Sequence, residues 1–154
     1  MISPEDFERL LPKAVLWVRE VEAAILLIGD PLPPQQRADA LAIGVSRADD
    51  VRMTVRLQML LPADAELRQL AIATGLIHQG TKGMTFGQGI ILKVGSIDRE
   101  LIAHELVHVR QYETRFGIEN FLRAYLPEIL PPGKYGEGPM EQEAINEARR
   151  ICGE

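Results

Sequence analysis

The segment His104-Glu-Leu-Val-His108 constrains the fold of this chain more than any other part of its sequence. It holds two of the chain's three histidines, four residues apart. On an α-helix this spacing is just over one turn, so both imidazoles project from the same face. The flanks include Ile102 and Val109 and are too apolar for a helix surrounded by water. The segment therefore predicts a helix over residues 97–116 whose histidines face a covered cleft.

Two imidazoles on one helical face can bind a single metal ion. Neutral imidazole suits Zn²⁺, and catalytic zinc sites combine three protein ligands with a water molecule. Glu105 lies beside the histidines, where its carboxylate can take a proton from a water whose pKa the metal lowers toward roughly 7. The pattern predicts one Zn²⁺ per chain, with His104 and His108 as ligands and Glu105 as the catalytic base. The alternative is a helix that carries two unrelated histidines.

A third metal ligand has to come from another part of the chain. The remaining histidine, His78, stands next to a glycine-rich turn, and a lone loop histidine is usually a polar surface residue. Zinc also accepts carboxylates, and Glu141 and Glu143 stand near the start of the last expected helix. They point about 200° apart on a helix, so at most one of them can face the metal. Either is a candidate ligand, and the other would be solvated or would support the site indirectly.

The pattern of apolar residues predicts a mostly helical α+β domain with a small sheet beside the histidine-bearing helix. Helical spacing covers residues 5–29, where Pro12 predicts a kink or a new helix start, and a second helix is expected from Pro33 to about Arg47. Apolar and polar residues alternate over 51–59, which predicts a half-buried strand. Residues 79–95 are rich in glycine and predict a turn with one or two strands.

The remaining helices are expected from their start and stop signals. Ser96 is the expected N-cap of the histidine-bearing helix, and Gly117 is expected directly after its C-terminal cap residue. Pro127 is expected in an open loop. The other helices are predicted at 62–75, at 118–125 and, beginning with Pro139, at 139–151.

Length and charge limit the classes of function. The 154 residues predict a single domain over 1–154, with a helical N-terminal segment at 1–50 and the sheet and site helices at 51–154. Seventeen basic against twenty-two acidic residues disfavour nucleic-acid binding. No apolar run reaches the roughly 18 residues of a membrane helix. The single cysteine, Cys152, allows no disulfide within the chain, which suits a cytoplasmic protein. Together with the acidic charge and the short apolar runs, this predicts a cytoplasmic protein without nucleic-acid or membrane partners.

The segment Leu101–Gln111 resembles the active-site helix of zincin metallopeptidases, and Glu141-Gln-Glu-Ala144 resembles the glutamate-bearing helix of their gluzincin branch. In many gluzincins the third ligand opens a Glu-x-x-Ala-Asp pattern, which would be Glu141 here, although Ile145 replaces the acid. In thermolysin-like members the pattern is Glu-x-x-x-Asp, which Glu143 and Glu147 approximate. The resemblance favours Glu141 as the third ligand, with Glu143 as the alternative. The histidine-rich extension of metzincins is absent.

The resemblance implies a minimal zinc peptidase that acts on a peptide or protein substrate. It also implies a substrate-binding strand beside the motif helix, for which residues 85–93 are the candidate. Tyr135 would stabilise a developing oxyanion, as a tyrosine does in several such enzymes. The alternative is a non-catalytic domain with a structural zinc or a partner-binding cleft. The N-terminal helix is expected to mediate self-association or to cover the cleft.

Overall fold

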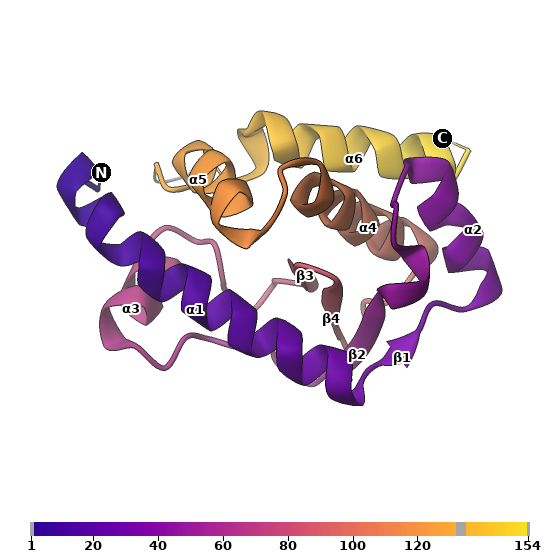
Figure 1. The fold of residues 1–154 in the computed structure, drawn as a ribbon, viewed down its shortest axis with the longest axis horizontal. Helices are drawn as coiled ribbons and strands as arrows, with labels where there is room; N and C mark the ends of the chain where they lie inside the picture. Colours follow the sequence, from indigo (N-terminus) through magenta and orange to yellow (C-terminus); the bar gives the residue numbers. More distant parts are fainter. Residues whose placement is uncertain (1, 132–134, 154) are drawn as a thin grey trace.

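The computed structural model describes residues 2–131 and 135–153, and of Tyr135 it describes the backbone only. Its α-helices and small sheet confirm the expected α+β, mostly helical fold (Figure 1). In chain order the elements are α1 (Pro4–Ile28), β1 (Asp30–Pro31), α2 (Pro34–Ile43), the 3₁₀ turn η1 (Ala48–Asp50), β2 (Arg52–Arg56), α3 (Ala65–Ala73), β3 (Gly83–Phe86), β4 (Gly89–Lys93), α4 (Arg99–Thr114), α5 (Ile118–Ile129), the 3₁₀ turn η2 (Tyr135–Glu137) and α6 (Pro139–Ile151).

The strands form one mixed sheet in the order β1-β2-β4-β3. The glycine-rich segment forms a hairpin, in which β3 and β4 pair antiparallel and Gly87 adopts the left-handed conformation at the turn. β2 runs parallel to β4, and the chain between them passes through α3. β3 is therefore the edge strand on this side of the sheet, and it packs against α4.

Strand β4 separates two hydrophobic clusters because its side chains alternate between the two faces of the sheet. Ile90 and Leu92 join the cluster formed with α2, α4 and α6, while Ile91 joins the cluster formed with α1 and α5. In Figure 1 the strands β3 and β4 lie between α1 and α4. The buried face of α1 consists of Leu10, Leu11, Val15, Val18, Val21 and Ile25. The N-terminal helix is thus part of the core.

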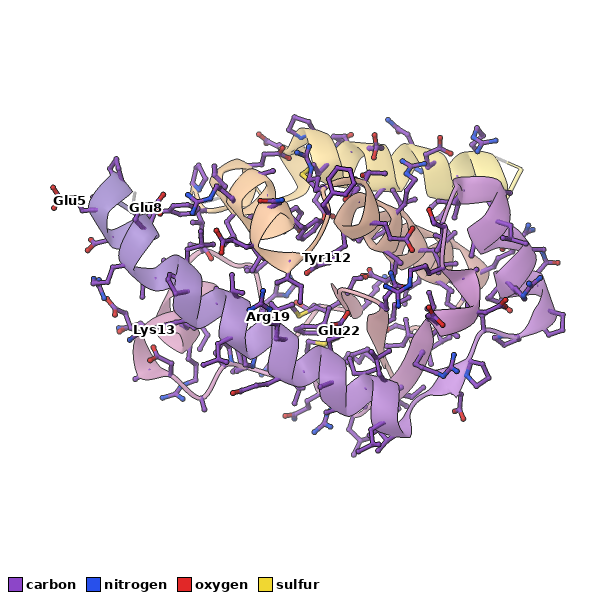
Figure 2. All side chains as sticks on the ribbon, in the orientation of Figure 1. Glu5, Glu8, Lys13, Arg19, Glu22 and Tyr112 are labelled. Atoms are coloured by element: carbon purple, nitrogen blue, oxygen red, sulfur yellow. The ribbon has the colours of Figure 1, made fainter. Side chains whose placement is uncertain are left out.

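Polar contacts also hold α1 in place. Glu22, labelled in Figure 2, accepts a hydrogen bond through Oε2 from the backbone N–H of Gln88 at 2.7 Å, in the β3–β4 turn. At the other end of the helix, Arg9 and Lys13 pair with Glu66 and Asp64 at the start of α3. None of the described helices is long and apolar enough to cross a membrane.

The structure decides against one of the two alternatives for Pro12, a new helix start, and against the loop expected at Pro127. Helix α1 continues from Pro4 to Ile28, so Pro12 starts no new helix. Helix α5 continues through Pro127 to Ile129, where an open loop was expected. The physical reason is the same in both helices: a row of buried apolar side chains continues past the proline and holds the helix against the core, which outweighs the lost backbone hydrogen bond.

The expected boundaries of the central elements also need correction. The strand expected at 51–59 ends at Arg56, where β4 ends as its partner, and Val55 and Leu57 are 50% and 79% exposed. Ser96 does not cap α4. Asp98 does, accepting the backbone N–H of Leu101 at 2.8 Å.

At the other end of α4, the residue directly after the C-terminal cap is Phe116, which adopts the left-handed conformation (φ 63°) expected of Gly117. The second helix ends earlier than predicted, at Ile43, because Gly44 adopts the left-handed conformation.

Candidate metal centre

Helix α4 presents His104, Glu105 and His108 to the interior. Its opposite side is fixed by packing, since Leu106, Val107 and Val109 are fully buried in the cluster between β4, α2 and α6. This packing sets the rotation of the helix about its axis. The two histidines therefore face the same region, as their spacing predicts, with the ring of His108 buried and that of His104 20% exposed.

Helix α6 brings Glu141 to the two histidines. The small buried residues Ala144 and Ala148 let α6 approach α4 closely, and Glu141 lies in the first turn of α6. Its Oε1 is 3.2 Å from Nε2 of His104, and its Oε2 is 2.7 Å from Nε2 of His108. One donor atom from each of the three side chains lies within 4.8 Å of the others. Of the two candidate glutamates, Glu141 is the one brought to the histidines.

Burial and charge act against each other on this cluster. The side chain of Glu141 is 3% exposed, and this burial raises its pKa, but hydrogen bonds from His104 and His108 outweigh it and hold the pKa well below the usual range. Burial lowers the pKa of His108, but its hydrogen bond to Glu141 and the charge of that carboxylate raise it to about 9. Without a metal, the carboxylate thus carries its negative charge next to a protonated imidazole.

Two further side chains orient the cluster. Tyr125, on α5, donates its hydroxyl hydrogen to Oε2 of Glu141 at 2.7 Å. Gln111, one turn after His108, lies with Oε1 2.8 Å from the Nδ1 atom of His108. Its amide nitrogen donates to the carbonyl oxygen of Met140 and to Glu143, so Oε1 is the atom that faces the histidine. Nδ1 of His108 must then be the donor, which directs Nε2 toward the site.

Glu143 has a supporting position. It accepts hydrogen bonds from Gln111 at 2.9 Å and from Arg110 at 2.8 Å, both on α4. Burial raises its pKa, but these hydrogen bonds outweigh the effect and lower it. Glu143 therefore contacts Gln111, which orients His108, and lies outside the cluster of the two histidines and Glu141.

The carboxylate of Glu105 is held by the edge strand. Its Oε1 accepts a hydrogen bond from the hydroxyl of Thr85 at 2.8 Å, and the side chain is buried. Gly83, on the same strand, comes so close that a Cβ atom there would lie 3.2 Å from Oε2. The strand thus fixes the carboxylate, and the glycine leaves space for it.

The site opens into two spaces of different polarity. A polar cleft of about 370 Å³ is lined by His104, Glu141 and charged residues including Lys82 and Arg149. A smaller pocket of about 120 Å³ on the other side is lined mainly by apolar residues and reaches His108. Glu105 and Gly83 line both spaces. Glu105 therefore borders a polar space and an apolar space.

His78, the remaining histidine of the chain, lies outside the cluster. His78 lines the polar cleft, but its Nδ1 accepts a hydrogen bond from the backbone N–H of Gly80. Tyr112 is buried and donates its hydroxyl to the carbonyl oxygen of Thr85. The side chain of Tyr135 lies outside the described part of the structure.

Sequence reasoning missed the supporting residues Gln111, Tyr125 and Thr85. Only Gln111 carries a local signal, because it follows His108 by three residues and therefore shares its helical face. Comparison with known proteins adds no name to this site: no family model, no curated protein and no solved structure matches the chain.

Proposed function

We propose that this protein is a zinc-dependent peptidase of the gluzincin kind. The observation that carries the proposal is the contact of Glu141, from α6, with both histidines of the H-E-x-x-H segment on α4. Two imidazoles and one carboxylate form a donor set that is typical of catalytic zinc sites. A structural zinc site would more often use four protein ligands.

The size of the cluster fits a zinc ion. One donor atom from each of the three side chains lies within 4.8 Å of the others, and zinc accepts both imidazole nitrogen and carboxylate oxygen. The Glu141 oxygens lie 3.2 Å and 2.7 Å from the nitrogens of His104 and His108. Small movements of the side chains would therefore admit an ion in exchange for the proton on His108. The hydrogen bond from His108 to Gln111 and the one from Tyr125 to Glu141 would remain in place while this happens.

Bound zinc would polarise the peptide carbonyl and lower the pKa of a water molecule toward about 7. Glu105 would take a proton from that water and pass it to the leaving amine. Thr85 would hold the carboxylate of Glu105 in the required orientation. The edge strand β3 would guide the peptide by strand addition, because it carries Thr85 and Gly83 directly beside Glu105.

The test is zinc content and peptidase activity of matched variants. We expect one zinc per chain in the wild type and a large loss of zinc in Glu141→Ala. Glu143→Ala should keep most of its zinc, since it removes only a partner of Gln111. Glu105→Gln should keep zinc and lose turnover by several orders of magnitude, with Glu119→Gln at an exposed position of α5 as the control. Unchanged activity in Glu105→Gln would refute the assignment.

The second candidate is a structural zinc or a cleft that binds a partner without cleaving it. The buried contact of Glu141, on α6, with His104 and His108, on α4, favours a structural zinc, because a metal joining two helices contributes to folding. It predicts that chelation unfolds the protein. A zinc-free protein that keeps its circular dichroism spectrum and regains activity with zinc would exclude a structural role. Self-association through α1 and a cytoplasmic location remain predictions from the sequence.

A further inference from the structure

The apolar pocket beside the candidate metal centre is built largely by parts of the chain outside the H-E-x-x-H region. Helix α1 forms one wall, and the segment around α3 forms a second. Strand β3 and helix α5 complete the enclosure. From α1 the pocket is lined by Phe7, Leu10, Leu11, Ala14, Trp17 and Val18. Figure 2 shows Tyr112, another lining residue, between α1 and α5.

The size of this pocket suits one large side chain. Its volume is about 120 Å³, and an apolar cavity of roughly 150 Å³ can bind a benzene molecule. Benzene is close in size to the ring of phenylalanine, and the side chains of leucine and methionine are similar. A longer segment of peptide would not fit.

The polarity of the pocket gives the orientation of such a group. Its ionisable lining residues are Glu105 and His108, at the metal centre, and Tyr112 and Tyr125. The opposite space, beyond Gly83 and Glu105, is the polar cleft. A bound group would thus place its apolar part against α1 and keep its polar part near Glu105.

We propose that the pocket binds an aromatic or long aliphatic side chain of the peptide substrate, next to the bond that is cleaved. This inference rests on the proposed function for the cleavage, while the binding itself requires no metal. The residues that set the size of the accepted side chain are Ala14 and Trp17, on α1. The N-terminal helix would therefore determine specificity.

The α1 wall of the pocket is firmly held. The ring of Trp17 packs edge-on against Phe86, with centroids 5.3 Å apart. The ion pairs of Arg9 and Lys13 fix α1 to the start of α3. Ala14 leaves space that a larger residue would fill. A preformed pocket loses little entropy on binding, which favours a specific side chain.

Binding can be measured without zinc because Trp17 is the only tryptophan of the chain. N-acetyl-L-phenylalaninamide should change its fluorescence saturably in chelator-treated protein, whereas N-acetylglycinamide should not. Ala14→Phe fills the pocket and should abolish the saturable change. Ala24→Phe makes the same substitution at an exposed position of α1 and should leave it intact. Equal responses to both amides, or equal binding in both variants, would overturn the inference.

Cleavage of a peptide library by the zinc-loaded protein tests the specificity. We expect the wild type to favour Phe, Leu or Met over Ala beside the cleaved bond by roughly 10- to 100-fold. Ala14→Phe should reduce this preference at least about tenfold, and Ala24→Phe should preserve it. If Ala14→Phe fails to fold, Ala71→Leu fills the same pocket from α3.

The two readouts separate this inference from the proposed function. Cleavage without preference for apolar side chains would overturn the inference and leave the peptidase assignment in place. Selective binding of the phenylalanine amide with no cleavage of any peptide would overturn the peptidase assignment. It would still support the pocket as an apolar binding site.

Discussion

The imidazole of His108 and the amide of Gln111 form a hydrogen bond of 2.8 Å between Nδ1 and Oε1, one turn apart on α4. The amide nitrogen of Gln111 continues the chain of contacts to α6, through the carbonyl oxygen of Met140 and the carboxylate of Glu143. Helix α6 thus acts on both nitrogens of the His108 ring. It holds Gln111, the partner of Nδ1, and its own Glu141 contacts Nε2. The orientation of His108 depends on both helices.

Gln111→Ala should weaken zinc binding by roughly 10- to 100-fold, because the ring of His108 loses the acceptor that fixes its tautomer. Competition with a chelating dye measures the affinity, and nitrogen NMR of the imidazole reports the tautomer. Gln58→Ala, at an exposed loop position, should change neither. An unaltered tautomer together with wild-type affinity in Gln111→Ala would contradict the positioning role.

Tyr125→Phe should reduce zinc affinity about tenfold, since it removes a hydrogen bond of 2.7 Å to the buried carboxylate of Glu141. Tyr112→Phe is the matched control, because its hydroxyl donates to the backbone carbonyl of Thr85 and does not contact the metal ligands. That variant should lose about 1 kcal/mol of stability and keep its zinc affinity. Isothermal titration with zinc distinguishes the two. Equal zinc affinities would show that Tyr125 has no influence on Glu141.

Thr85→Val should lower the rate of peptide cleavage about tenfold with zinc content unchanged, because the carboxylate of Glu105 loses its hydroxyl partner at 2.8 Å. Thr85→Ser keeps the hydroxyl and should restore most of the rate. The measurement is kcat/KM for one fluorogenic peptide, with zinc determined on the same samples. If Ser and Val variants are equally slow, the effect comes from strand packing and the hydrogen bond is irrelevant.

Asp39→Asn should destabilise the fold by roughly 1–3 kcal/mol, because Asp39 on α2 accepts two hydrogen bonds of 2.9 Å from the guanidinium of Arg99. These hydrogen bonds lower the pKa of Asp39 below its ordinary 3.8, against the opposing effect of burial. A carboxylate with a lowered pKa stabilises the folded state at pH values above its pKa in the unfolded chain. This contribution is lost as the pH falls through its pKa in the folded state.

Urea denaturation at pH 7 and pH 3 tests the role of Asp39. The wild type should lose more stability than Asp39→Asn between these two pH values. Asp30→Asn, at an exposed carboxylate, serves as the control and should behave as the wild type. If Asp39→Asn shows the same pH dependence as the wild type, the ion pair with Arg99 does not contribute as described.

Local patterns in the sequence identify several features of the structure. The spacing of His104 and His108 requires a common helical face, and α4 provides it. The glycine-rich segment forms the β3–β4 hairpin, and Pro139 begins α6. Each of these features depends on residues close together in the chain. The loop at Pro127 and a new helix start at Pro12 are not found, because local propensity ignores the core packing that holds both helices past these prolines.

The sequence by itself determined the H-E-x-x-H face of α4 and indicated two carboxylates, Glu141 and Glu143, as candidates to contact it. Only the tertiary structure decided between them, because the choice depends on how α6 rotates against α4 around Ala144 and Ala148. The same holds for Tyr125, which reaches Glu141 from another helix. Helical periodicity fixes directions within one element, whereas contacts between elements depend on the packing of the whole core.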